Sequence, residues 1–303
     1  MNQLADLSQN LNQILDTETV EPNQLWGPAI CTHNLAMVVA PTGLGKTYKM
    51  MKLAWTISTG GKFLNHTCYR PSKVLYIDGE LGISTMKKRL KMIQAEAPFS
   101  PRGDFFRVLS KDHCGGRLWN ISDPKDQKKY NQQIKDAEVI VIDNLLSSIF
   151  PVDGRDNDVR QWERIIPWLF ALRDTGRTVI MVHHTGKSGL QLGTSIKENW
   201  LDTSIELRAP AVLRPVRGTE FELHYRKTRD VKKCDAMPLH VEYLEGDDGV
   251  SRWNWSPLED SQSRTVQQMK GEGMTRRDVA KQLGLSFREV QLAWDKWEVG
   301  HED

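Results

Sequence analysis

The stretch Ala40-Pro-Thr-Gly-Leu-Gly-Lys-Thr47 (APTGLGKT) decides the fold that we expect for this chain. The apolar, partly β-branched run Leu35–Ala40 leads into it, as a buried parallel strand would. Apolar residues recur at helical spacing in the run that follows, residues 48–58 (YKMMKLAWTIS). Strand, glycine-containing loop and helix therefore follow one another in the order of a phosphate-binding loop, except that Ala40 stands where glycine is commoner.

Each residue type in this loop has a task in holding a polyphosphate. Gly43 and Gly45 let the backbone curl so that successive N–H groups point at phosphate oxygens, and the following helix adds the positive end of its dipole. We expect Lys46 to reach the outer phosphates and the Thr47 hydroxyl to hold Mg²⁺. The expected nucleotide-binding residues of the loop are Pro41, Thr42, Gly43, Leu44, Gly45, Lys46, Thr47 and Tyr48.

A second apolar run, Val74–Ile77, leads directly into Asp78 and Glu80. Acids at the carboxyl end of a parallel strand face the ligand crevice of an open α/β sheet. We expect Glu80 to orient and polarise an attacking water, because phosphoryl transfer depends on positioning and electrostatics. The alternative is structural: Glu80 caps the next helix and Asp78 makes a turn.

A third apolar run, Val139–Ile142, ends at Asp143. Four apolar residues closed by an aspartate downstream of a phosphate loop form the pattern in which the carboxylate holds Mg²⁺ through water beside Thr47. Asp143 is therefore the expected partner of Thr47 in the magnesium site. An ordinary strand-ending aspartate is the alternative.

A fourth apolar run, Thr178–Val182, ends at His183 and His184. The sequence near this pair contains neither a cysteine nor a further histidine that would complete a tetrahedral metal site. We interpret one of the two as a polar sensor that hydrogen-bonds the terminal phosphate or a water. A buried, hydrogen-bonded histidine without such a role is the alternative.

These motifs, in this order, resemble the RecA-like ATPases related to the plasmid replication helicase RepA and, more distantly, to DnaB and RadA. The resemblance covers about residues 25–230, through VLYIDGE, VIVIDNL, VIMVHHTGKSG and GTSIKENWLDTSIEL. It implies an α/β fold with a twisted, mostly parallel sheet, ATP and Mg²⁺ as ligands, and Glu80 as the catalytic glutamate. It also implies a homo-oligomer, a hexameric ring, that acts on single-stranded DNA.

The same resemblance assigns roles to several cations. In DnaB-like rings a strand ending in K-x-R sends both cations to the neighbouring subunit's nucleotide, and Lys227 and Arg229 match this spacing after the strand expected at residues 221–225. A basic strand end that pairs with surface acids is the alternative. Lys187 and Lys197 are the expected contacts to DNA phosphates in the central channel.

Both ends of the chain extend beyond the ATPase core, which we place at residues 25–257. Residues 1–24 contain an apolar stripe over residues 4–15 that predicts an amphipathic helix, packed either on an adjacent subunit or on its own domain. Residues 258–303 read as a linker and a helix-turn-helix unit, in which Thr275 caps one helix and Arg288 lies near the start of the next. Such a unit contacts DNA or docks protein, and we expect Arg288 to contact DNA.

Composition narrows the class of protein without naming an activity. The 303 residues are 39% hydrophobic and 26% charged, values typical of globular proteins. Because 41 Lys and Arg residues nearly balance 39 Asp and Glu residues, attraction to nucleic acid has to come from local patches. Four cysteines without a C-x-x-C pair, no leader pattern and no long apolar stretch predict a cytoplasmic protein without a membrane partner.

The sequence as a whole favours an ATP-hydrolysing, ring-forming DNA helicase or translocase that serves replication of a plasmid, phage or other mobile element. An ATP-gated DNA-binding regulator or adaptor without unwinding activity is the alternative. A RadA-like recombination accessory factor is a third reading, which the absence of that family's zinc cysteines disfavours.

Overall fold

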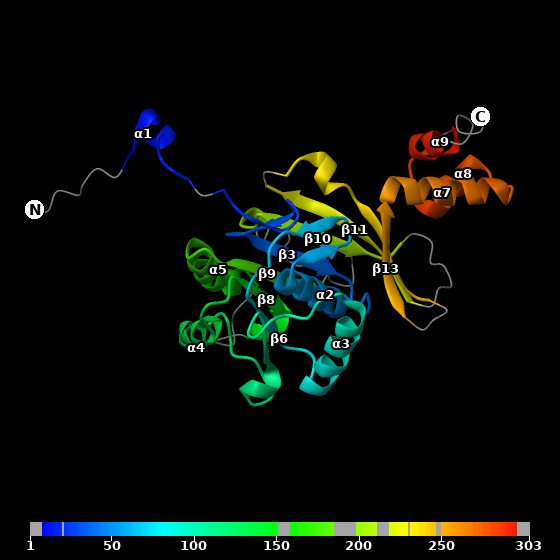
Figure 1. Ribbon diagram of the computed structural model, residues 1–303. Coiled ribbons are helices and arrows are strands. Elements are labelled where there is room, and N and C mark those ends of the chain that lie inside the picture. Colours follow the sequence, from blue (N-terminus) through cyan, green and yellow to red (C-terminus); the bar gives the residue numbers. More distant parts are fainter. Residues whose placement is uncertain are drawn as a thin grey trace, which may run out of the picture.

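The computed structural model describes residues 8–19, 21–150, 158–184, 198–210, 218–229, 231–246 and 250–295. Within these residues a nine-stranded sheet forms the centre of the molecule, in the order β13-β12-β11-β10-β3-β9-β8-β6-β7 (Figure 1). Six neighbouring strands are parallel: β10 (Thr203–Arg208), β3 (Leu35–Ala40), β9 (Thr178–His184), β8 (Val139–Asp143), β6 (Val74–Asp78) and β7 (Phe106–Ser110). Three antiparallel strands extend it: β11 (Gly218–Thr228), β12 (Leu239–Glu245) and β13 (Ser251–Pro257).

Helices cover both faces of the parallel strands. Alternate residues of β3 belong to different cores, so that Val38 packs on one face and Met37 on the other. The first core includes α2 (Lys46–Thr59) and α3 (Ile83–Glu96), and the second includes α4 (Pro124–Ile134) and α5 (Asp158–Asp174). All six residues of β3 are buried, which is why the strand reads as a continuous apolar run and not as an alternation.

This three-layer arrangement confirms the predicted α/β fold with a mostly parallel sheet. Each of the four apolar runs expected as strands is a strand, and all four are parallel, so their carboxyl ends meet at one edge of the sheet. Smaller elements border the core: β1 (Gln24–Trp26), β2 (Ile30–Cys31), β4 (Gly61–Phe63), β5 (His66–Cys68) and 3₁₀ turns at Lys111–Cys114, Leu145–Ser148 and Lys233–Ala236.

The C-terminal residues form a unit of three helices beyond β13 (Figure 1). These helices are α7 (Leu258–Gly271), α8 (Arg276–Leu283) and α9 (Phe287–Asp295), and they share a small core of Val266, Met269, Val279, Val290 and Ala293. The Thr275 side chain caps α8 by accepting from the Asp278 amide, as the sequence predicts.

The segment that we expected to be a linker, at the start of residues 258–303, is helical. Helix α7 begins at Leu258, directly after the strand, and Glu259 and Asp260 lie in its first turn, where the helix dipole favours acids. Leu258 is buried and its amide donates to the carbonyl of Pro238 at 2.8 Å. The first turns of α7 are therefore fastened to the sheet.

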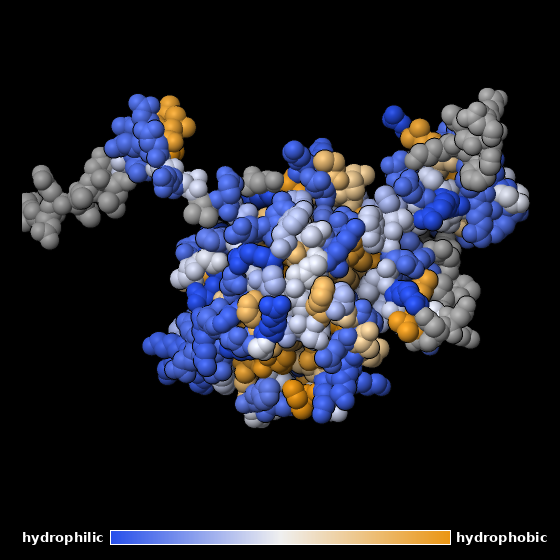
Figure 2. Space-filling view, in the orientation of Figure 1, coloured by the Kyte–Doolittle hydropathy of each residue, from blue (hydrophilic) through white to orange (hydrophobic). Residues whose placement is uncertain are grey.

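The described part of the N-terminal segment carries a short helix, α1 (Leu11–Leu15). Residues 4–7, the first part of the predicted amphipathic stretch, lie outside the described residues. Asn10 and Gln13 form a capping box, yet Leu11, Ile14 and Leu15 are 72%, 54% and 71% exposed. The helix projects away from the sheet, and its apolar side shows as an orange patch (Figures 1 and 2). Among the described residues, every helix is too short or too polar to cross a bilayer.

The three-helix core gives a direct stability prediction. Val290 is fully buried in it, whereas Leu292 on the same helix is 64% exposed. We expect Val290→Ala to destabilise the C-terminal unit by about 1–3 kcal/mol, because the lost methyl groups are buried, and Leu292→Ala to change its stability by less than about 0.5 kcal/mol. Hydrogen exchange of the α7–α9 amides measures both, and equal effects would contradict the packing described here.

Candidate nucleotide site

The loop at residues 41–45 joins the carboxyl end of β3 to the first turn of α2. Gly43 and Gly45 have φ values of 88° and 70°, a region that other residues adopt at a cost. A methyl group added at Gly43 would meet nothing within 4 Å, so the backbone conformation and not packing requires glycine there. Pro41 and Thr42 are exposed, while Lys46 and Thr47 are buried at the start of the helix.

The Lys46 side chain folds back onto this loop. Its Nζ donates to the carbonyls of Ala40 at 2.9 Å and Pro41 at 2.8 Å, and lies 2.9 Å from Nδ1 of His184. Burial lowers the pKa of Lys46, and the carboxylates of Glu80 and Asp143 oppose that shift. The ammonium group is thus held at the mouth of the loop, next to the acids expected to act with it.

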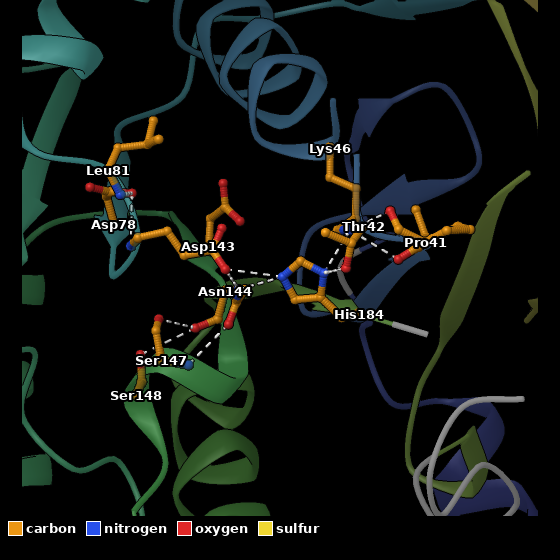
Figure 3. A network of polar contacts seen from close by, with 12 residues as sticks. Pro41, Thr42, Lys46, Asp78, Leu81, Asp143, Asn144, Ser147, Ser148 and His184 are labelled. Carbon is orange, nitrogen blue, oxygen red and sulfur yellow. Dashed lines mark hydrogen bonds and ion pairs between the residues drawn. The ribbon is translucent and has the colours of Figure 1, made fainter. Parts of the chain in front are cut away.

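His184 connects Lys46 to Glu80. Figure 3 shows its ring between Lys46 and Asn144. Its Nε2 lies 3.0 Å from Oε1 of Glu80 and 2.8 Å from Nδ2 of Asn144, which donates to the same Glu80 oxygen. Because a lysine ammonium can only donate, Nδ1 of His184 accepts from Lys46. The ring therefore links the phosphate lysine to the expected general base.

The two adjacent histidines lie on opposite faces of β9. His184 is paired with Ala40 and joins the network, whereas His183 is paired with Val39 on the α4–α5 side of the sheet and is 3% exposed. The sequence left the choice of sensor between them open. The structure brings only His184 of the pair into contact with Lys46 and Glu80.

Asp143 lies beside Thr47 at the same edge. Asp143 is 1% exposed and accepts from the Tyr76 hydroxyl at 2.6 Å. Burial raises the pKa of Asp143, and hydrogen bonds from Tyr76 and Thr47 oppose that rise. Hydroxyl and carboxylate oxygens are the hard donors that Mg²⁺ takes, so Thr47 and Asp143 together fit the expected ion.

Asp78 holds the turn that carries Glu80. Its Oδ1 accepts from the amides of Leu81 at 3.1 Å and Glu80 at 3.4 Å, and burial raises its pKa to about 6. Glu80 itself is exposed and does not cap α3, because the cap residue is Gly82 and the Ile83 amide donates to Asp112. Asp78 thus makes the turn, and the Glu80 carboxylate is left facing Asn144 and His184.

Lys227 and Arg229 lie at the opposite edge of the sheet. Lys227 is paired with Ser204, which lies near the amino end of β10. Because β10 is parallel to β3, this end of the sheet is the one opposite the phosphate loop. Both cations therefore lie about 15–20 Å from the phosphate loop of their own chain. Lys227 Nζ donates to the Glu198 carbonyl at 2.6 Å, and Arg229 lies 3.2 Å from Oδ1 of Asp202. Within one chain, then, Arg229 pairs with an acid and does not approach Lys46.

Comparison with known proteins shows to which family the chain belongs. A family model described as the AAA domain matches residues 3–189. The chain belongs to the AAA domain family. A search of the curated proteins finds no match.

Three solved structures align with most of the chain. A KaiC-like protein from Pyrococcus horikoshii aligns with a TM-score of 0.50 and 13% identity, over 75% of this chain and 91% of that one. The flagellar accessory protein FlaH from Methanocaldococcus jannaschii aligns at 0.47 and 10% over 74% and 91%. The RadB recombinase aligns at 0.47 and 15% over 73% and 90%. The family match and the KaiC-like neighbour support a RecA-like P-loop ATPase.

Some expected site residues of this AAA domain protein lie elsewhere. The Tyr48 hydroxyl contacts Glu96 at 2.7 Å and Tyr243 at 3.0 Å, so its side chain points from α2 toward α3 and β12 and not toward the loop. Lys187 and Lys197 lie outside the described residues. Arg288 is exposed on α9, in the C-terminal unit of three helices.

Three residues of the site went unpredicted. Tyr76 holds Asp143, Asn144 holds Glu80, and Lys49 donates to the Leu44 carbonyl and so fastens the loop from within α2. Burial lowers the pKa of Lys49 to about 8. Of these three residues, only Tyr76 could have been predicted from the sequence, because a tyrosine inside an apolar strand needs a hydrogen-bond partner for its hydroxyl.

The raised pKa of Asp78 predicts a pH dependence of stability. The pKa of Asp78 in the folded protein, about 6, lies above the ordinary value of 3.8. Between these two pH values the folded protein therefore binds more protons than the unfolded chain does. As pH rises through this range, the Asp78 carboxyl thus lowers the free energy of unfolding. We expect Asp78→Asn to raise the free energy of unfolding by roughly 2–3 kcal/mol above pH 6 and to leave it unchanged below about pH 4.

Denaturant titrations across this pH range measure the difference between variant and wild type. Asp104→Asn removes an acid whose side chain is 55% exposed and is the control. The burial explanation is wrong if the Asp78→Asn difference is constant with pH or falls as pH rises.

Proposed function

We propose that this chain is the subunit of an ATP-hydrolysing, ring-forming DNA helicase or translocase that serves replication of a plasmid, phage or other mobile element. The observation that carries the proposal is the position of Lys227 and Arg229 at the sheet edge opposite Lys46. From there they cannot reach the nucleotide of their own chain, but a neighbouring subunit stacked edge to edge would receive them. Head-to-tail contacts of this kind form a ring when the rotation from one subunit to the next closes.

Binding of ATP follows from the loop. Its amides and the Lys46 ammonium would receive the phosphates, while Thr47 and Asp143 would hold Mg²⁺, which when bound neutralises charge between the outer phosphates. The terminal phosphate competes for the Lys46 ammonium that His184 now contacts at 2.9 Å. His184 would therefore register the presence of that phosphate, which is the sensor role expected for one of the two histidines.

Hydrolysis needs a positioned water. Glu80 would orient it and accept its proton, since the carboxylate is exposed at the loop edge and Asn144 and His184 fix its Oε1. Because His184 contacts both groups, a change at Lys46 reaches Glu80 through one ring. Lys227 and Arg229 of the neighbouring subunit would complete the site by stabilising the charge that develops on the transferred phosphoryl group.

Assembly has a second support in α1. Its apolar side is exposed over Leu11, Ile14 and Leu15, and a surface of this kind stabilises contact with another subunit. A hexamer with single-stranded DNA in its channel, gripped by Lys187 and Lys197, is the form that the resemblance to ring helicases implies. The described α7–α9 unit holds six basic and six acidic residues, so DNA contact there would depend on individual groups such as Arg288.

Complementation between two inactive variants tests the shared site. Lys46→Ala spoils the loop of its own subunit, and Arg229→Ala spoils the site of the neighbour, so each variant alone should lose roughly 10³-fold or more in ATPase rate. An equal mixture should regain up to about a quarter of the wild-type rate, because half of the subunits supply an intact loop and half supply intact cations.

Arg226→Ala is the matched control, because Arg226 lies three residues before Arg229, near the end of β11, and also pairs with an acid, Glu198, at 3.7 Å. It should keep near wild-type turnover. The shared site is wrong if Arg229→Ala retains turnover, or if the mixture of the two variants stays inactive.

Strand separation distinguishes the helicase from the ATP-gated regulator. We expect wild-type protein with ATP and Mg²⁺ to unwind a forked DNA, and Lys46→Ala to leave the fork intact because its loop cannot hold the phosphates. Light scattering of the same samples gives the subunit count. ATP hydrolysis and DNA binding without any unwinding would instead support the regulator.

A further inference from the structure

The three antiparallel strands carry a second cluster of ionisable side chains, away from the nucleotide site. Phe221 points into the core on the α2 side, and the residues that alternate with it point to the opposite face. The strand register sets Glu220 directly opposite Glu242, and Glu222 directly opposite His240. Three carboxylates and one imidazole therefore form a compact block on two neighbouring strands.

Much of this block is buried, which is unusual for charged groups on the outer face of a sheet extension. The side chains of Glu220, His240 and Glu242 are 2%, 7% and 21% exposed. A cavity of about 510 Å³ lies between them and the C-terminal helices, and Ser261 and Thr265 of α7 line its other side. The block thus faces a partly open cavity beneath α7.

The donor atoms are spaced almost as metal ligands are. One ligand atom each of Glu220, His240 and Glu242 lies within 4.8 Å of the other two. His240 Nε2 is 3.3 Å from Oε1 of Glu242 and 3.8 Å from Oε2 of Glu220. A tetrahedral Zn²⁺ with bonds of about 2.0–2.2 Å sets its ligand atoms about 3.3–3.5 Å apart, so small side-chain rotations would complete the geometry.

We propose that Glu220, His240 and Glu242 bind a divalent transition-metal cation of the Zn²⁺ or Mn²⁺ type. One imidazole nitrogen with two carboxylate oxygens matches the ligand preference of these ions. Like charges directly opposite each other on adjacent strands repel, and a cation between Glu220 and Glu242 turns that repulsion into attraction. Three protein ligands leave one position open toward the cavity for water.

The ion would stabilise the place where the C-terminal unit joins the sheet. It would tie β11 to β12, and the Leu258 amide of α7 is bonded to Pro238, the residue just before β12. The site shares no residue with the nucleotide site at Lys46 and Asp143. The competing arrangement is a protonated His240 that bridges the two carboxylates without any metal.

Metal binding to the full chain, treated with chelator and freed of nucleotide, tests the proposal. We expect calorimetric titration with Zn²⁺ and, separately, Mn²⁺ to show about one equivalent bound at this site by at least one of the two ions, with a rise in melting temperature. His240→Gln and Glu242→Gln should each lower that affinity more than ~10-fold, since loss of a supporting residue alone typically costs that much.

Two controls make the result specific. His224→Gln lies on the same face of β11 but outside the three-ligand set, and it should bind the ion as wild type does. Asp143→Asn removes the acid of the nucleotide site and should also leave this equivalent in place. The proposal is overturned if wild type binds no equivalent of either ion, or if His240→Gln and Glu242→Gln, shown by circular dichroism to be folded, bind the metal as tightly as wild type.

Discussion

Burial of charged groups at the carboxyl edge of the parallel strands is the constraint on which the rest of the nucleotide site depends. Lys46, Asp78 and Asp143 are all buried there, and each is costly to keep in that state without partners. The chain supplies the partners from neighbouring strands: Tyr76 for Asp143, the turn amides for Asp78, and the loop carbonyls for Lys46. A nucleotide with its ion would take over part of this pairing, so the contacts that hold the loop would also prepare it for the nucleotide.

In the proposed function, His184 would connect ATP binding to hydrolysis, because one nitrogen of its ring faces Lys46 and the other faces Glu80. In the proposed mechanism, a phosphate that drew Lys46 away would free Nδ1 of His184 and so would change the contact between Nε2 and Glu80.

Much of this arrangement was predictable from sequence, and the reasons for the exceptions are physical. The loop, Asp143 and Glu80 could be placed at one edge because the motifs follow buried runs and parallel strands align their ends. The choice between His183 and His184 could not be made, because β9 is buried on both faces and no alternation reveals which side each residue takes. The role of Asn144 could not be predicted, because its contact with Glu80 joins the ends of two strands that are far apart in the sequence.

Strand direction was also invisible in the sequence. The K-x-R spacing identified Lys227 and Arg229 by resemblance, but only the antiparallel pairing of β11 with β10 places them at the far edge. The helix that replaces the predicted linker was also hard to see in the sequence. The segment is mostly polar, and only one apolar residue in its first turn, Leu258, is buried where α7 meets the sheet.

The sheet itself sets the distance between the two halves of the proposed composite site. Because β3 is only six residues long, the phosphate loop and the cations of one chain stand about 15–20 Å apart on opposite edges. Side chains cannot span that distance, so any contribution of Lys227 and Arg229 to hydrolysis requires a second chain whose amino edge faces this carboxyl edge. In the proposed ring, ATP hydrolysis would then depend on assembly alone, because the site of a single subunit lacks the two cations that its neighbour would supply.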